Sequence, residues 1–159
     1  GEDVKNEQRS RNMRNTIFRL LELGALPVIN ENDTVATAEL KHIENFGDND
    51  TLSAVVARMC DADLLVIFSD IDGLYDSNPR TNPQAKLINH VGRIDAKIRR
   101  MAGGAGSAHG TGGMATKLLA AQIAVGAGCE MVIANGEKPE LLYDIVAGKP
   151  IGTRFLVKR

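Results

Sequence analysis

One stretch of the chain combines several glycines, a lysine and the start of an apolar helical pattern. Residues 110–117 read Gly-Thr-Gly-Gly-Met-Ala-Thr-Lys and run directly into the largely apolar residues 118–124. Glycine has no Cβ, so backbone N–H groups can approach a ligand closely and positive φ is accessible. The N-terminus of a helix adds unpaired N–H groups and the positive end of its dipole. Because Lys117 adds a full positive charge, the stretch predicts a phosphate-binding site.

The same stretch is also compatible with a flexible linker in front of an ordinary helix. It lacks the spacing of a Walker A motif. No G-x-G-x-x-G opens a helix directly after a strand, as the dinucleotide fingerprint requires. Its function therefore depends on what the fold places beside it.

Composition indicates an ordinary globular protein rather than a nucleic-acid or membrane protein. The 159 residues fit one domain or a large piece of one, with 43% hydrophobic and 25% charged residues. A net charge of −1 and 4% aromatic residues argue against a nucleic-acid partner. No apolar run approaches the roughly 20 residues that span a bilayer. Cys60 and Cys129 lie in apolar surroundings, which favours buried free thiols and a cytoplasmic location.

Hydrophobic periodicity predicts helices that alternate with strands, and therefore an α/β fold with a largely parallel sheet. The run at 64–68 is continuously apolar, which is typical of a central strand buried on both faces. The first helix is expected to end at Gly24 and to bury Met13, Ile17, Leu20 and Leu21, and the last to bury Leu141, Leu142, Ile145 and Val146. Helices are expected at 13–21, 52–59, 94–101, 114–125 and 139–146, and strands at 26–30, 64–68, 130–134 and 152–157.

Three polar clusters fall where predicted strands end or helices begin: residues 30–33, 48–50 and 69–72. Open α/β sheets bind ligands at the carboxyl ends of their strands, and crossover handedness brings such ends to one side. Each cluster has a simpler alternative. Residues 30–33 can form an Asx turn, and Asn49 or Asp50 can cap a helix. Their convergence with residues 110–117 favours a shared ligand site, whereas the basic cluster of the 94–101 helix fits a solvated face.

Four motifs resemble the amino acid kinase family, and within it the members that act on glutamate. They are residues 27–33 (PVINEND), 46–50 (FGDND), 69–75 (SDIDGLY) and 110–117 (GTGGMATK), and NPR at 78–80 and NPQA at 82–85 extend the match. The similarity covers nearly the whole chain. It implies a three-layer α/β/α sandwich with a mainly parallel sheet, the carbamate kinase-like fold. Residues 1–159 would form a single partial domain, with acceptor motifs at 30–50 and an ATP-binding portion at about 62–159.

The resemblance also implies a reaction and a set of site residues. The reaction is transfer of the ATP γ-phosphoryl group to the side-chain carboxylate of L-glutamate, the first step toward proline. The cofactors would be ATP and Mg²⁺, with no residue singled out as a metal ligand and a homo-oligomer at full length. Carried over by position, the catalytic residues are Lys117 and Asp50, the substrate-binding residues are Asn30, Asp33, Asp48 and Asn49, and the ATP-binding residues are Ser69, Asp70, Thr111, Gly112, Gly113, Met114, Ala115, Thr116 and Lys117.

The chemistry of that reaction fits these residue types. A glutamate carboxylate, with a pKa of about 4.3, is already ionised at neutral pH, so it needs no general base. The obstacles are repulsion between two anions and their alignment. Lys117, the helix N-terminus and Mg²⁺ address the phosphate, and Asn30 and Asn49 can bind the amino acid without adding charge. We therefore expect Asp50 to organise Lys117 rather than to accept a proton.

The chain departs from the family pattern at both ends. Against the family pattern, we expect this chain to lack the second glycine-rich loop and second catalytic lysine that family members carry in their N-terminal part, and to lack a C-terminal RNA-binding-like PUA domain. Residues 40–46 also make the link between the two acceptor motifs longer than is usual in the family. We expect this chain to bind nucleotide without turning over alone. The alternatives are a kinase acting on aspartate, acetylglutamate, carbamate or a nucleoside monophosphate, a non-catalytic nucleotide-binding module and, least favoured, a nicotinamide-dependent oxidoreductase.

Overall fold

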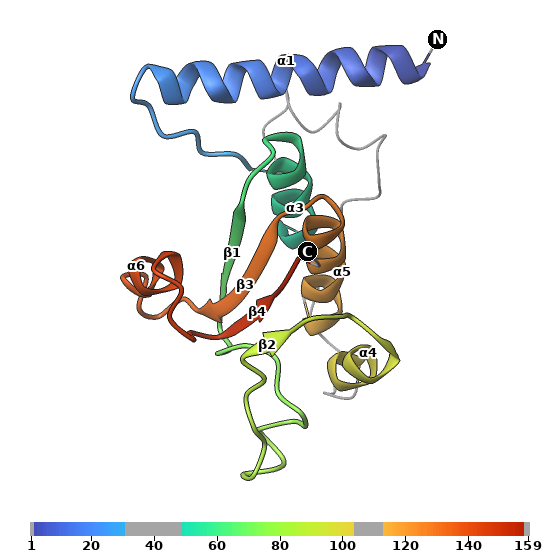
Figure 1. The fold of residues 1–159 in the computed structure, drawn as a ribbon, viewed down its shortest axis with the longest axis vertical. Coiled ribbons are helices and arrows are strands. Elements are labelled where there is room, and N and C mark those ends of the chain that lie inside the picture. Colours follow the sequence, from blue (N-terminus) through green and yellow to red (C-terminus); the bar gives the residue numbers. More distant parts are fainter. Residues whose placement is uncertain (1, 31–48, 104–112, 158–159) are drawn as a thin grey trace.

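The fold is known from a computed structural model that describes residues 2–30, 49–103 and 113–157 (Figure 1). The helices predicted from periodicity are all present, and so are the strands predicted at 64–68, 130–134 and 152–157. The helices are α1 (Glu2–Glu22), α3 (Asn49–Met59), α4 (Ala96–Gly103), α5 (Met114–Gly126) and α6 (Leu141–Val146), and the strands are β1 (Leu64–Ser69), β2 (His90–Val91), β3 (Glu130–Asn135) and β4 (Thr153–Phe155).

The strands form one mixed sheet in the order β1-β3-β4-β2. β1 pairs with β3 in parallel, from Leu64 opposite Glu130 to Ser69 opposite Asn135. β2 and β4 are also parallel, whereas β3 and β4 are antiparallel. The sheet is therefore mainly parallel, as predicted. β2 has only two residues, too few for an alternating pattern to reveal it in the sequence.

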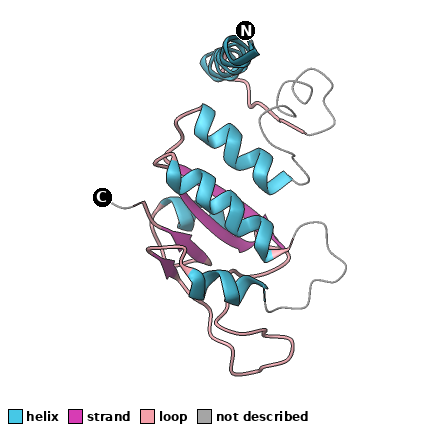
Figure 2. Cartoon of the chain, turned by 90° about the vertical axis from the view of Figure 1, so that its right-hand side faces the viewer, coloured by secondary structure: helices cyan, strands magenta, loops and turns pink. Residues whose placement is uncertain are grey.

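Helices cover both faces of this sheet, which gives the predicted three layers. Successive side chains of a strand point to opposite faces. In β3, Met131 and Ile133 pack in the core beneath α3 and α5, whereas Val132 and Ala134 pack against Ile145 of α6. Figure 2 shows α3 and α5 side by side over one face, and Figure 1 shows α6 on the other. β3, with four fully buried residues between its ends, is the central strand.

Two strand predictions are wrong. β1 is not buried on both faces: Ile67 alone is buried, because no strand of the described residues pairs with the outer side of β1. Residues 26–30 form no strand, and Leu26 and Val28 are 85% and 84% exposed. A strand needs a neighbour to satisfy its backbone polar groups, and the described chain places none beside this segment.

The outer helices bury less of their apolar faces than the sequence suggests. In α1, Ile17 is buried but Leu21 is 50% exposed; the helix ends at Glu22, and Gly24 follows it as the predicted C′ residue, with φ of 73°. In α6, Ile145 is fully buried but Val146 is 67% exposed. α6 has six residues and lies on the sheet, so it covers the sheet with one narrow stripe, whereas α1 packs against α3 through residues such as Met13.

A side-chain cap defines the start of α4. Asp95 caps α4, because its Oδ1 accepts from the N–H groups of Lys97 and Ile98, each at 2.9 Å. These bonds lower the pKa of the Asp95 carboxyl, with the Ile98 N–H the largest cause. The basic residues of α4 are exposed, as expected of a solvated face.

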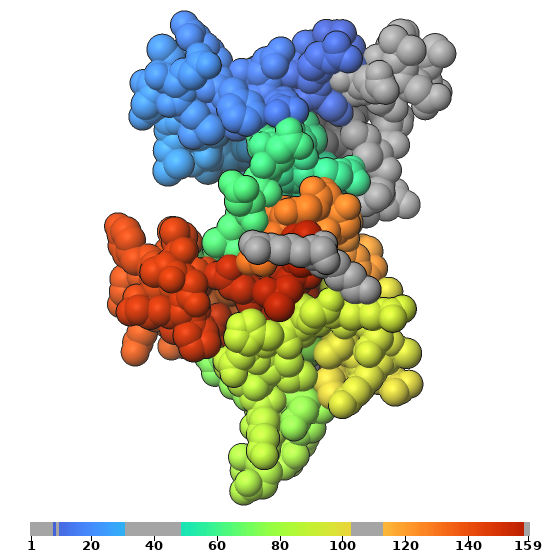
Figure 3. Space-filling view, viewed as in Figure 1, coloured from blue at the N-terminus to red at the C-terminus, as the bar shows by residue number. Residues whose placement is uncertain are grey.

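In the space-filling view, the turn-rich residues 76–86 project at the lower end of the molecule (Figure 3).

Two further predictions concern the thiols and the membrane. Both cysteines are free; Cys129 is buried as expected, whereas Cys60 is half-buried. Burial raises the pKa of the Cys129 thiol. None of the helices in the described ranges is long and apolar enough to cross a membrane.

Candidate active site

The starts of α3 and α5 lie together because of the connections that follow these helices. α3 ends at Met59 and β1 begins at Leu64, while α5 ends at Gly126 and β3 begins at Glu130. Connections this short return the chain antiparallel to the helix it has just left. Since β1 and β3 are parallel, the first turns of both helices point toward the edge where these strands end. The order of the elements thus brings Asp50 of α3 close to the first turn of α5.

A buried ion pair joins the two helix starts. Lys117 Nζ donates to Asp50 Oδ2 at 3.0 Å, and only 7% of the lysine side chain and 15% of the aspartate side chain are exposed. Screening by water is weak at such a site, so each charge depends strongly on its partner. The structure thus brings Asp50 and Lys117 into contact, and the organising role of Asp50 stays a prediction.

Thr116 adds a second donor to the same carboxylate oxygen. Its Oγ1 lies 3.1 Å from Asp50 Oδ2 and 2.7 Å from the carbonyl oxygen of Gly113. The sequence motif places Thr116 among the predicted ATP-binding residues and does not predict this contact. The adjacent hydroxyl and ammonium donors at 116 and 117 were the available signal, but only the fold shows which acceptor they share.

The start of α5 offers backbone donors, as the glycine-rich motif predicted. Gly113 is the N-cap, and no side chain caps the helix there. The N–H groups of Thr116 and Lys117 bond to the Gly113 carbonyl, so those of Met114 and Ala115 precede the helical hydrogen bonds. Gly113 has φ of −79° and ψ of −176°, an extended conformation open to any residue. Positive φ is therefore not what this glycine provides.

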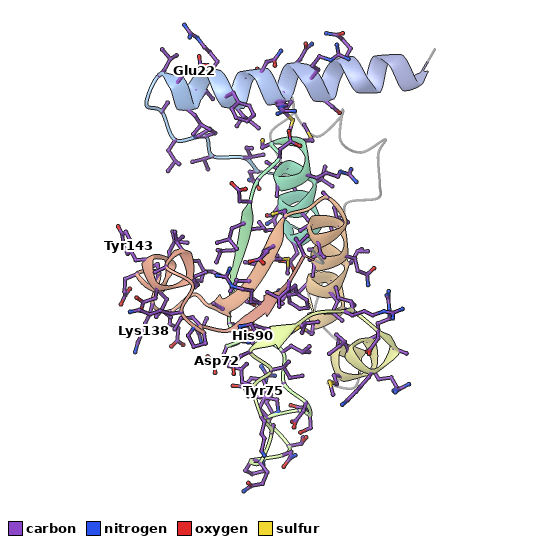
Figure 4. All side chains as sticks on the ribbon, viewed as in Figure 1. Glu22, Asp72, Tyr75, His90, Lys138 and Tyr143 are labelled. Atoms are coloured by element: carbon purple, nitrogen blue, oxygen red, sulfur yellow. The ribbon has the colours of Figure 1, made fainter. Side chains whose placement is uncertain are left out.

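A second polar cluster lies at the carboxyl ends of β1 and β3. Ser69 Oγ donates to the exposed Asp70 at 3.2 Å. One carboxylate oxygen of Asp72 accepts a hydrogen bond from Tyr75 Oη, and the other accepts one from Asn135 Nδ2, each at 2.9 Å. Figure 4 shows Asp72 and Tyr75 close together at the lower end of the sheet. The sequence missed Asn135 as a site residue, although its place at the end of a strand was a usable signal.

Two further predicted site residues, Asn30 and Asn49, are described but are not joined to either cluster by a described side-chain hydrogen bond. Asn30 is exposed at the end of the segment that forms no strand, and Asn49 is exposed at the first residue of α3. Neither shares a side-chain hydrogen bond with the Asp50–Lys117 pair among the described contacts. The other four predicted residues, Asp33, Asp48, Thr111 and Gly112, lie outside the described residues.

The described residues contain no group of three or more His, Cys, Asp or Glu side chains that could hold a metal ion. Mg²⁺ usually keeps several waters and is bound through one or two carboxylates together with substrate phosphates. Asp70 is exposed and offers a carboxylate, which is a ligand that Mg²⁺ binds. The carboxyl end of β1 is therefore compatible with a nucleotide-bound Mg²⁺.

Comparison with known proteins settles the family. A model of the amino acid kinase family matches residues 2–135, which is most of the chain. This chain belongs to the amino acid kinase family. The fold agrees: UMP kinase from Bacillus anthracis superposes with a TM-score of 0.62 at 18% identity, covering 92% of this chain and 52% of that one.

Curated proteins named glutamate 5-kinase are similar to this chain. The protein from Clostridium perfringens is 51% identical over 156 residues, which are 98% of this chain and 58% of that protein. The one from Shewanella halifaxensis is 52% identical over 153 residues, which are 96% of this chain and 40% of that protein. The chain thus spans about half the length of the curated relatives it matches.

Proposed function

We propose that this chain is part of a glutamate 5-kinase, which transfers the γ-phosphoryl group of ATP to the side-chain carboxylate of L-glutamate. The observation that carries the proposal is the buried Lys117–Asp50 pair at the start of α5. The similarity to curated glutamate 5-kinases supports the choice of acceptor. The product, γ-glutamyl phosphate, is the first intermediate toward proline.

In the proposed mechanism the protein positions two anions and offsets their repulsion. The glutamate carboxylate is the nucleophile and is ionised at neutral pH, so no residue removes a proton from it. Lys117 and the N–H groups at the start of α5 face the transferring phosphoryl group and stabilise its charge in the transition state. Asp50 holds the lysine ammonium at 3.0 Å and so fixes where that charge lies.

The two substrates would occupy opposite sides of this pair. Ser69, Asp70 and the loop at 111–117 would bind ATP. Asn30, Asp33, Asp48 and Asn49 would bind glutamate, with Asp33 or Asp48 suited to its ammonium group. Mg²⁺ would arrive with ATP and supply charge neutralisation between the phosphates. A cytoplasmic location and a homo-oligomeric state belong to the same proposal.

The acceptor can be tested directly. The protein encoded by the complete reading frame would be assayed for ADP release with ATP, Mg²⁺ and one of five acceptors: glutamate, aspartate, acetylglutamate, carbamate or UMP. We expect turnover with glutamate and with none of the other four acceptors. Preference for another acceptor would replace the proposal with a different member of the family, and ATP binding without turnover on any acceptor would favour a nucleotide-binding module.

The roles of the pair are tested in the same assay. Lys117→Met should abolish turnover, and Asp50→Asn should lower kcat by about a hundredfold or more, comparable to the loss of an electrostatic group in other active sites. Lys138→Met, which alters an exposed lysine, is the control. If Asp50→Asn left turnover unchanged while Lys117→Met abolished it, Asp50 would not organise the lysine.

A further inference from the structure

One carboxylate oxygen receives side chains from two consecutive residues of α5. Asp50 Oδ2 lies 3.1 Å from Thr116 Oγ1 and 3.0 Å from Lys117 Nζ. Consecutive residues of an α-helix point about 100° apart, because there are 3.6 residues per turn. The two side chains nevertheless meet at one carboxylate oxygen. This convergence is a specific arrangement rather than a consequence of helix geometry.

The Thr116 hydroxyl has one proton and two acceptors within reach. The nearer acceptor, the Gly113 carbonyl, already receives the N–H groups of Thr116 at 3.1 Å and Lys117 at 3.4 Å. A carbonyl oxygen has two lone pairs, so this atom is satisfied without the hydroxyl. The ionised carboxylate is the stronger acceptor. The proton of Thr116 is therefore directed at Asp50.

This bond fixes the orientation of Asp50 as well as its position. Oδ2 takes both donors from α5, while Oδ1 accepts no hydrogen bond from the residues that the structure describes. A carboxylate held by a single flexible lysine can rotate, but one held by a lysine and a hydroxyl on a rigid helix cannot do so without losing a bond. A phosphate that took the Thr116 proton would have to break this contact.

We propose that Thr116 is a positioning residue whose hydroxyl holds the Asp50 carboxylate for Lys117, instead of contributing that hydroxyl to the nucleotide. The inference rests on the proposed kinase function of the same site. It assigns the described part of the motif, residues 113–117, two roles: the backbone N–H groups at the start of α5 face the phosphates, and the side chains of Thr116 and Lys117 hold the Asp50 carboxylate.

The first test compares two substitutions in the protein encoded by the complete reading frame. Thr116→Val keeps the shape and removes the hydroxyl, so kcat for glutamate phosphorylation should fall about tenfold while KM for ATP stays within about twofold. The expected loss is that of one hydrogen bond to a charged group. Thr116→Ser keeps the hydroxyl and should restore kcat to within about threefold. A rise in KM for ATP with kcat unchanged would instead show a nucleotide ligand and overturn the proposal.

The second test needs no substrate, so it separates this inference from the proposed function. Urea unfolding would be measured for Thr116→Val, Asp50→Ala and the double variant. If the hydroxyl acts through Asp50, Thr116→Val should lower the unfolding midpoint in the wild-type background but change it little in the Asp50→Ala background. Equal shifts in both backgrounds would overturn the proposal whether or not glutamate is the substrate.

A matched control separates the hydroxyl contact from the general effect of valine in a helix. Thr16 of α1 bonds through its hydroxyl to the Asn12 carbonyl, a backbone contact on an exposed helix. Thr16→Val should therefore give the same small shift in the wild-type and Asp50→Ala backgrounds. If Asp50→Ala does not fold, the contrast between Thr116→Ser and Thr116→Val decides alone.

Discussion

Lys117 Nζ and Asp50 Oδ2 lie 3.0 Å apart across α3 and α5, with both side chains largely buried. Removing one partner of a buried ion pair typically costs about 3–5 kcal/mol of unfolding free energy. We expect losses of this size for Lys117→Met and for Asp50→Leu, and a smaller loss for the double variant than for the sum of the two. Urea unfolding monitored by circular dichroism measures each value.

The surface pair between Lys149 and Asp144 provides the contrast. These side chains are 60% and 39% exposed, so Lys149→Met should cost at most about 1 kcal/mol. Additive losses for Lys117→Met and Asp50→Leu would show that the buried pair contributes nothing beyond two separate residues.

Gly152 permits the turn into β4 to pass close to β3. Its φ is +65°, and a Cβ added there would overlap the carbonyl oxygen of Ile133. Gly152→Ala combines a disfavoured backbone conformation with a clash against main chain, so it should lower the unfolding free energy by well over 1 kcal/mol. Thermal unfolding would report this as a lower Tm. Gly92→Ala is the control, since nothing lies within 4 Å of a Cβ added at that position; equal Tm values for the two variants would contradict the prediction.

Short-range patterns predicted most of the fold, and long-range pairing supplied what they could not. The helix period and the apolar runs located β3 and α5 because these signals are local to the chain. The status of residues 26–30 depends on whether a neighbouring strand lies beside them, and no local pattern contains that information. The same is true of β1, whose apolar sequence fits a central strand although it lies at the edge of the described sheet.

The candidate site divides in the same way. Lys117 and Asp50 were predicted because their residue types and the resemblance to a family pointed to a role; the structure shows them in contact, and the role stays a prediction. The hydrogen bond from Thr116 to Asp50 and that from Asn135 to Asp72 each join residues more than 60 positions apart. Such contacts follow from the register of strands and the rotation of helices, which residue types alone do not specify.

Arg154 joins α6 to the sheet through both ends of its guanidinium. Nη1 lies 2.8 Å from Glu130 Oε2, and Nη2 donates to the carbonyl of Ile145 near the end of α6 at 2.6 Å. A lysine ammonium is a point charge and cannot span two such acceptors. Arg154→Lys should therefore speed amide hydrogen exchange of α6 and residues 147–151 by about fivefold, the effect of one lost hydrogen bond. Mass spectrometry after deuterium labelling measures this, with Arg80→Lys in an exposed turn as control. Unchanged exchange in α6 would show that the helix is held by its apolar contacts.

The Tyr75 hydroxyl stabilises the polar cluster at the carboxyl ends of β1 and β3, which includes Asp72 and Asn135, in a pH-dependent way. Its hydrogen bond to Asp72 is the main cause that raises the pKa of Tyr75 above its usual value. The folded state therefore favours the neutral phenol. This contribution is complete below the unfolded pKa of about 10 and is lost as the pH rises through the higher folded value. Tyr75→Phe should be less stable than wild type by about 1 kcal/mol at pH 8, and the difference should shrink above pH 10.

The measurement is urea unfolding of wild type and Tyr75→Phe from pH 7 to 11. The difference between their unfolding free energies is used, because the contributions of the other titrating groups cancel in it. Tyr143→Phe is the control, because Tyr143 is 80% exposed and points away from the sheet on α6 (Figure 4). Its difference from wild type should stay near zero across the range. A Tyr75→Phe difference that is constant or grows above pH 10 would show that the bond to Asp72 does not favour the neutral phenol, and the cluster would then owe its order to Asn135 alone.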